Sequence, residues 1–120
     1  AKAIMNKSEA LYPEKVFDLA EQNYIKDFGE GWGLGWLIVD GKYPQTGKLF
    51  PIGSFGHCGH TGTSLFFSRE KGMYVIILTN ATRCLNKKNG FKGYDYNKIC
   101  EMRADIHNAI FDDLSESGLI

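Results

Sequence analysis

The chain has 120 residues, which is enough for one small domain and too few for two. Hydrophobic residues make up 43% of it and charged residues 23%, as in ordinary globular proteins. Fourteen basic residues balance fourteen acidic ones, so the net charge gives no reason to expect nucleic acid or an anionic membrane as a partner. No apolar run approaches the ~20 residues that span a bilayer. Residues 1–5 do not resemble a signal peptide, because no apolar core follows the charge.

Three cysteines, Cys58, Cys84 and Cys100, cannot all pair with one another within one chain. The sequence is therefore not a disulfide framework, although a single bridge is compatible with it. We favour free thiols, either in a reducing compartment or buried as small hydrophobic side chains.

The first half of the chain predicts one short helix and one strand. Pro13 suits a first helical turn, and a helix over about 13–23 would have an apolar face made by Val16, Phe17, Leu19 and Ala20. Residues 33–39, GLGWLIV, predict a strand that ends at Asp40-Gly41, a dipeptide typical of hairpins. The following residues, 41–54, are rich in glycine and proline and predict a loop.

The second half predicts two further strands. Residues 57–68 form one extended stretch, whose glycines indicate a bulge or a close approach of the backbone. A polar turn at 69–72 precedes residues 73–79, which predict a strand buried on both faces because polar and apolar residues do not alternate in it. We therefore expect a hairpin over 65–79 and a polar loop over 81–95.

A long amphipathic helix is predicted to end the chain. Asn97 suits an N-cap, and the apolar residues that follow recur in steps of three and four at Ile99, Met102, Ile106, Ile110 and Leu114. The predicted fold is α+β, with an antiparallel β-sheet of about three strands flanked by helices. Two helices can cover one side of such a sheet. A strand at 73–79 that is buried on both faces would need further layers of structure.

The densest group of reactive side chains lies at residues 56–64, GHCGHTGTS. The run GHCGHTGTSLFFSREKGMYVIILTN resembles a segment of bacterial serine hydrolases of the β-lactamase, esterase and penicillin-binding superfamily, GHTGFTGTSLWIDPE followed by VVLLTN. The resemblance extends upstream to EGWGLGW at 30–36 and downstream to Arg103 and Ile106-His107-Asn108. Together these segments cover most of the chain from about residue 8 onward.

The resemblance implies that residues 1–120 are the C-terminal fragment of a β-lactamase/transpeptidase-like domain, related to the class C enzymes, without its nucleophile-bearing part. In that superfamily a Lys-Thr-Gly or His-Thr-Gly triplet on an edge strand borders the active site. The triplet falls on His57-Cys58-Gly59. The resemblance implies a catalytic, basic role for His57, substrate contact at Cys58, clearance for substrate at Gly59, and an oxyanion-hole N–H near His60.

The sequence departs from the family pattern at several positions. Cys58 replaces threonine, and a thiol is a weaker donor, which argues mildly against classical β-lactam specificity. His60 stands where the family usually has an aromatic residue. The nucleophile motif Ser-x-x-Lys occurs only as Ser68-Arg69-Glu70-Lys71, in a predicted turn, and we interpret it as a coincidence. The Tyr-x-Asn or Tyr-x-Ser partner is absent, so the fragment alone is expected to be inactive.

The parent protein implied by the resemblance is bacterial and hydrolyses or transfers an acyl group from an ester, amide or β-lactam through an acyl-serine. Its partners would be that small-molecule substrate and the remainder of the parent chain, with no cofactor, no metal and no nucleic acid. The sequence leaves its location open. His107, beside the apolar stripe, is expected to be structural, and His57 has the alternative of a strand histidine bonded to backbone.

Two other classes of function remain open at this point. One is a non-catalytic module that binds through exposed aromatic residues, with Trp32, Trp36, Phe66, Phe67 and Tyr74 as candidates. The other, less favoured, is a zinc-binding domain built from His57, Cys58, His60 and Cys84. On a regular strand Cys58 and His60 would share a face and His57 would point away, which divides that group.

Overall fold

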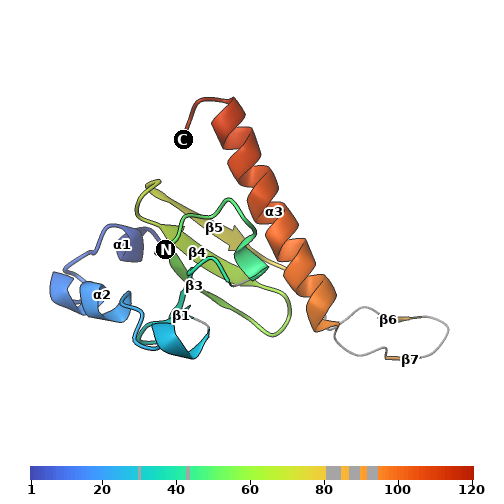
Figure 1. Cartoon of the computed structure of the whole chain (residues 1–120), viewed down its shortest axis with the longest axis horizontal. Coiled ribbons are helices and arrows are strands. Elements are labelled where there is room, and N and C mark those ends of the chain that lie inside the picture. Colours follow the sequence, from blue (N-terminus) through green and yellow to red (C-terminus); the bar gives the residue numbers. More distant parts are fainter. Residues whose placement is uncertain (30, 43, 81–84, 87–89, 92–94) are drawn as a thin grey trace.

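A computed structural model of the chain describes residues 1–29, 31–42, 44–80, 85–86, 90–91 and 95–120. Five strands form one antiparallel sheet in the order β1-β2-β3-β4-β5 (Figure 1). They are β1 (Gly31–Trp32), β2 (Leu37–Ile38), β3 (Phe55–Cys58), β4 (Ser64–Ser68) and β5 (Met73–Ile77). This arrangement agrees with the α+β class, but the sheet has five strands, not three.

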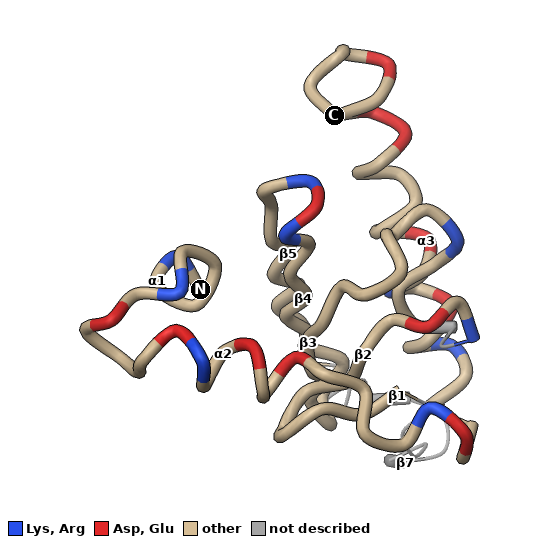
Figure 2. The backbone as a smooth tube through the Cα atoms, turned by 60° about the vertical axis from the view of Figure 1, so that its left-hand side comes forward, with Lys and Arg blue, Asp and Glu red and all other residues tan. Residues whose placement is uncertain are grey.

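Helices lie on both sides of the sheet. The N-terminal helices are α1 (Lys2–Met5) and α2 (Glu14–Ala20), and the long C-terminal helix is α3 (Tyr96–Glu116). Figure 2 shows β4 and β5 between α1 on one side and α3 on the other. Two 3-10 turns, η1 (Lys26–Phe28) and η2 (Pro44–Thr46), interrupt the loops, and β6 (Leu85–Asn86) pairs with β7 (Gly90–Phe91) in a separate ribbon.

Alternation along β4 divides the core into two parts. Phe66 points toward α3, where it packs with Val75, Ile77 and Phe111. Phe67 points the other way and stacks on Phe55, with 5.0 Å between ring centroids. Both phenylalanines are fully buried, so the middle of the sheet has an apolar layer on each face.

The predicted strand at 33–39 is wrong, because these residues form most of a hairpin. Gly33 N–H donates to the Trp36 carbonyl at 2.8 Å, and the turn leaves only Leu37 and Ile38 in a strand. The extended stretch at 57–68 likewise divides into β3 and β4 around a turn at 59–63. An apolar or glycine-rich run does not reveal such reversals, since glycine is compatible with both a strand and a turn.

The prediction that residues 73–79 are buried on both faces is also wrong. Val75 and Ile77 are buried under α3, whereas Tyr74, Ile76 and Leu78 are 41%, 49% and 82% exposed. β5 is the last strand of the sheet, and the N-terminal helices reach only the part of this face around Phe55. The outer strand therefore presents apolar side chains to solvent.

The predicted helix at 13–23 exists as α2, but its apolar face is mostly exposed. Phe17 is buried, whereas Val16 and Leu19 are 37% and 47% exposed. The amphipathic pattern thus predicts a helix correctly without identifying which of its side chains are covered.

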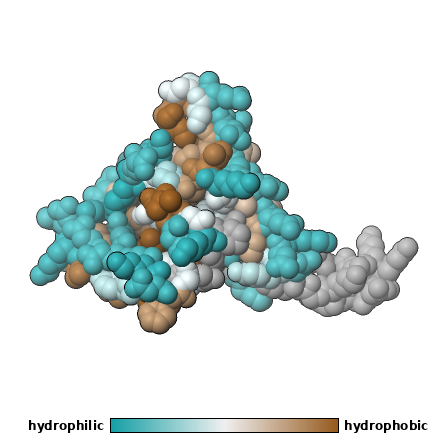
Figure 3. Space-filling view, viewed as in Figure 1, coloured by the Kyte–Doolittle hydropathy of each residue, from teal (hydrophilic) through white to brown (hydrophobic). Residues whose placement is uncertain are grey.

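The molecular surface is mainly hydrophilic on the face that Figure 3 presents, with scattered apolar patches.

The N-cap of helix α3 is Asp95, whose side chain accepts a hydrogen bond from Lys98 N–H at 3.2 Å, and not Asn97. Its buried line differs from the predicted stripe and runs through Ile99, Cys100, Arg103, His107 and Phe111. The predicted residues Met102, Ile106 and Ile110 pack against the edge of the same core. Of the predicted loop at 81–95, residues 81–84, 87–89 and 92–94 lie outside the described residues.

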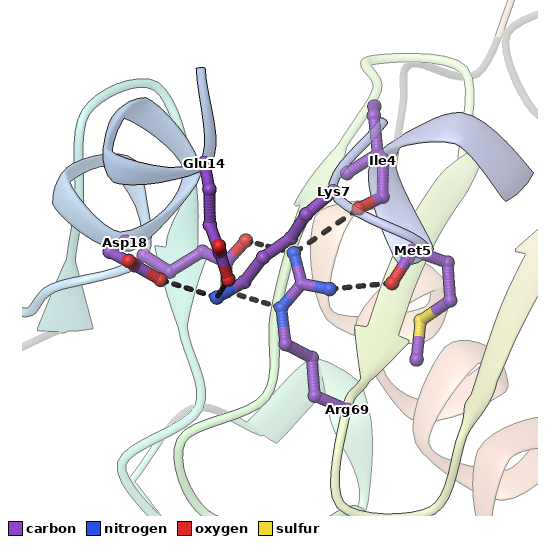
Figure 4. Close-up of polar contacts among 7 residues, drawn as sticks. Ile4, Met5, Lys7, Glu14, Asp18 and Arg69 are labelled. Carbon is purple, nitrogen blue, oxygen red and sulfur yellow. Dashed lines mark hydrogen bonds and ion pairs between the residues drawn. The ribbon is translucent and has the colours of Figure 1, made fainter. Parts of the chain in front are cut away.

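Arg69 fastens the N-terminal segment to the sheet (Figure 4). Its guanidinium donates to the carbonyls of Met5 at 2.6 Å and Ile4 at 3.2 Å, and to the carboxylate of Glu21. The same group lies 5.2 Å from the centre of the Phe55 ring. Beside it, Lys7 binds Asp18 at 2.5 Å, which joins α2 to the residues after α1.

Candidate functional site

The triplet His57-Cys58-Gly59 lies at the end of β3, the third of five strands, so the prediction that its strand is an edge strand is wrong. β4 pairs with the whole of β3, but β2 pairs only with Phe55 and Gly56. On the β2 side, ladder pairing therefore ends before His57. From His57 onward, β3 is therefore paired with β4 and no longer with β2.

The first two residues of the triplet lie on opposite faces of the sheet. His57 is opposite Leu65 and Cys58 is opposite Ser64 in the register with β4. Cys58 is half-buried and packs against the core under α3, whereas His57 is exposed on the other face. The His57 ring meets the edge of the Trp32 ring, with 5.9 Å between centroids.

The turn that follows the triplet is held by a buried arginine on α3. Arg103 is 1% exposed, and its guanidinium donates to the carbonyls of Gly59 at 2.8 Å, Gly62 at 2.9 Å and Thr63 at 2.9 Å. It also donates to the side-chain oxygen of Gln45 in η2. A charged donor makes stronger hydrogen bonds than a neutral one, so Arg103 fixes the path of residues 59–63.

Two glycines of this turn have structural reasons to be glycine. Gly62 has φ of +93°, and a Cβ there would come within 2.4 Å of Thr79 Oγ1, whose hydroxyl donates to the Thr61 carbonyl at 2.8 Å. A Cβ at Gly59 would lie 2.1 Å from Thr63 Oγ1. A larger residue at position 59 would therefore require the Thr63 side chain to move, apart from the predicted role of Gly59 in substrate clearance.

His60 lies in the turn between β3 and β4 with its side chain exposed. It follows Gly59 directly, so its backbone is part of the segment that Arg103 holds. An oxyanion-hole role at His60, and the roles of His57, Cys58 and Gly59 toward substrate, remain predictions.

His107 is fully buried, in agreement with the structural role expected for it. Its Nδ1 lies 3.2 Å from the Gln45 carbonyl, and its ring packs against the edges of Phe50 and Phe66, with 5.1 and 5.6 Å between centroids. Within the described part of the chain, Nε2 has no hydrogen-bond partner. Burial lowers the pKa of His107, since the apolar surroundings disfavour the imidazolium.

The Ser-x-x-Lys match is part of a turn, as interpreted from the sequence. Ser68 ends β4, and its hydroxyl accepts a hydrogen bond from Lys71 N–H at 3.2 Å. The serine is fully buried. The Lys71 ammonium lies 3.9 Å from the Glu70 carboxylate.

The described residues contain no group of three His, Cys, Asp or Glu side chains arranged to hold a metal ion. His57 and Cys58 lie on opposite faces, and Cys84 lies outside the described residues. Among the described residues, neither Cys58 nor Cys100 is part of a disulfide. No helix in the described ranges is long and apolar enough to cross a bilayer.

A groove of about 780 Å³, which the sequence does not indicate, lies between the loop after β2 and the first half of α3. Its floor is apolar, with Val39, Phe50, Cys100 and Ala104. The hydrogen bonds of Arg103 to the turn are also not apparent from the sequence. One signal was available, because Arg103, His107 and Phe111 recur every four residues beside the apolar stripe.

No family model matches the sequence, and no curated protein matches it. Among solved structures, the crystal structure of a β-lactamase from Mycobacterium bovis superposes with a TM-score of 0.68 at 17% sequence identity. The match covers 95% of this chain and 40% of that one, so the chain spans less than half the length of the β-lactamase. At this identity the likeness shows the fold alone. The chain has a β-lactamase-like fold.

Proposed function

We propose that this chain is the C-terminal part of a β-lactamase-related serine hydrolase. The parent protein hydrolyses or transfers the acyl group of an ester, amide or β-lactam through an acyl-serine intermediate. The nucleophile and its general base come from polypeptide outside these 120 residues, since Ser68 is buried in a turn. The isolated chain is therefore inactive.

One observation carries the proposal: a histidine-led triplet ends β3 in a β-lactamase-like fold, directly before a turn that Arg103 clamps. Catalytic groups must be held in place by their supports, because misplacement by about 1 Å can cost ~100-fold in rate. A guanidinium bonded to three carbonyls of one turn gives such support. An ordinary hairpin turn needs no buried charge.

Each residue has a separate proposed role. His57 is exposed and is the proposed proton-transfer group beside the acyl-serine. Cys58 and Gly59 contact substrate, and the backbone N–H near His60 stabilises the oxyanion. Cys58 has the weakest support of the four, because its side chain packs toward the core under α3.

The test is to treat the full-length protein with a serine-directed fluorophosphonate, a chromogenic cephalosporin and a short-chain p-nitrophenyl ester. We expect one labelled serine outside residues 1–120 and turnover of the cephalosporin or the ester. The isolated chain, treated in parallel, should neither label nor turn over. If no serine labels and neither substrate reacts, the proposal is wrong.

Most of the aromatic residues that were candidates for a binding surface are not exposed. Phe66 and Phe67 are fully buried in the two core layers, and Trp36 packs edge-on against Phe55 and Phe67. Of the five candidates, only Tyr74 is exposed. Nothing in the described residues favours this alternative over the hydrolase.

A further inference from the structure

We propose that the groove between the loop after β2 and the first half of α3 is a docking site for an amphipathic helix. The helix belongs to the part of the parent β-lactamase-like chain that has no counterpart in these 120 residues. This inference goes beyond the proposed chemistry, because it concerns assembly of the fold and does not involve the His57 triplet.

The groove has the dimensions of a helix-binding surface. Its α3 wall extends from Tyr96 to Asn108, thirteen residues or about 18 Å along the helix axis. Its volume is about 780 Å³. Three turns of a second helix would match this length, with one side chain per turn reaching the apolar floor.

The loop wall is fixed against α3, so the groove is preformed. Asn108 Oδ1 accepts hydrogen bonds from the backbone N–H of Lys48 at 2.8 Å and of Leu49 at 3.3 Å. Gly47, with φ of +72°, lies so close that a Cβ there would come within 2.3 Å of the same oxygen. These N–H groups are already satisfied, which leaves side-chain packing as the mode of docking on this wall.

The two walls carry charges of opposite sign. Lys42 and Lys48 lie on the loop wall, and Glu101 and Asp105, one helical turn apart, lie on the α3 wall. Among the residues that the structure describes, none of these four side chains forms an ion pair. An occupant with acidic residues along one flank and basic residues along the other would complement both walls.

A polypeptide fits the groove better than a small molecule does. The rim residues Ile52 and Tyr96 are 74% and 50% exposed, so the space is an open trough and not an enclosed chamber. A helix with an apolar face and charged flanks matches an apolar floor between charged walls. The β-lactamase that superposes on this chain supplies the source, because more than half of that protein has no counterpart here.

The test uses two synthetic helical peptides of about 18 residues that share one leucine face. The mixed peptide has glutamates along one flank and lysines along the other, and the acidic peptide has glutamates along both. Cys100 lies in the groove floor, so its alkylation rate reports occupancy, while Cys58 serves as an internal control. Cys84 is replaced by serine in every sample.

We expect the mixed peptide to slow alkylation of Cys100 without affecting Cys58, and to do so at roughly tenfold lower concentration than the acidic peptide. In the Glu101→Lys/Asp105→Lys variant both walls are basic, so the preference should reverse. The matched control is Asp112→Lys/Asp113→Lys, which makes the same change in charge on exposed residues of α3 outside the groove. Circular dichroism checks that each variant keeps its helices.

Three results would overturn the proposal. One is that neither peptide protects Cys100 at millimolar concentration. Another is an unchanged preference for the mixed peptide in the Glu101→Lys/Asp105→Lys variant. That result would mean that the charges of the groove walls do not determine which peptide binds. The third is protection of Cys100 that rises with protein concentration alone, which would assign the groove to a second copy of this chain. None of these results depends on hydrolase activity.

Discussion

The guanidinium of Arg103 lies 2.8 Å from the carbonyl oxygen of Gly59, a residue 44 positions earlier in the chain. This contact joins the middle of α3 to the end of the His57-Cys58-Gly59 triplet. Arg103 has no carboxylate partner among its hydrogen bonds, which go to three backbone carbonyls and the Gln45 side chain. Its charge is therefore compensated by oriented peptide dipoles.

Replacing Arg103 by methionine should strongly destabilise the fold. The substitution keeps much of the side-chain volume but leaves buried carbonyls without a donor, so we expect a loss of about 3 kcal/mol or more in the free energy of unfolding. Urea titration followed by circular dichroism measures it. Lys98→Met removes a charge from an exposed position of the same helix and should stay within about 0.5 kcal/mol. Equal effects of the two substitutions would contradict the clamp.

Gly62→Ala should cost more stability than Gly35→Ala. Both glycines have positive φ, +93° and +80°, so alanine is strained at each, by ~1–2 kcal/mol. A Cβ at Gly62 would in addition meet Thr79 Oγ1 at 2.4 Å, whereas nothing lies within 4 Å of one at Gly35. Thermal unfolding of the two variants gives the comparison. Greater destabilisation by Gly35→Ala than by Gly62→Ala would contradict this expectation.

Stability should fall as the pH falls below about 6.5, the ordinary pKa of histidine. Burial lowers the pKa of His107 in the folded state, so the unfolded chain binds the proton more readily and gains from acidification. The loss begins near the unfolded pKa and continues down to the folded one. Urea titrations between pH 7.5 and 5.5 measure it.

His107→Gln is the matched variant for this pH dependence. Glutamine keeps a side-chain N–H that can donate to the Gln45 carbonyl but does not titrate. The slope of unfolding free energy against pH should therefore be smaller in the variant than in the wild-type chain. The same slope in both proteins would assign the pH dependence to other groups.

On β5, lysine should be tolerated at Ile76 and not at Val75. Ile76 is 49% exposed on the outer face, so Ile76→Lys should change the unfolding free energy by no more than about 0.5 kcal/mol and reduce self-association. Val75 is 7% exposed beneath α3, where an unpaired ammonium would cost several kcal/mol (~3 or more). Sedimentation velocity and urea titration measure the two effects. A folded, stable Val75→Lys chain would contradict the described register.

Local sequence signals predicted the elements whose features are local. Helix α3, the polar turn at 69–72 and the hairpin around it depend on side chains close together in the sequence, and all three exist, although the buried line of α3 differs from the predicted stripe. The prediction of a continuous strand over residues 33–39 failed, because an apolar run does not show whether the backbone at its glycines is extended or reverses direction. Which face of β5 is exposed depends on the other elements that cover the sheet. The sequence of the strand alone does not predict this exposure.

The candidate site likewise has features that the sequence predicts and features that it does not. The triplet and its glycines are visible in the sequence, because they follow one another along one strand and its turn. The clamp by Arg103 and the groove beside it join segments more than 40 residues apart, so no local pattern contains them. A charged residue within a buried helix face was the one local sign of the clamp.

The central claim is that His57 acts beside a serine that lies outside this chain. The most direct measurement is the turnover of a short-chain p-nitrophenyl ester or a chromogenic cephalosporin by the full-length protein and its His57→Ala and His57→Lys variants. His57 is exposed, so neither substitution should unfold the protein. We predict that alanine lowers kcat/KM by roughly 100-fold or more and that lysine, also able to transfer protons, restores much of it. Unchanged kcat/KM in His57→Ala would contradict the claim.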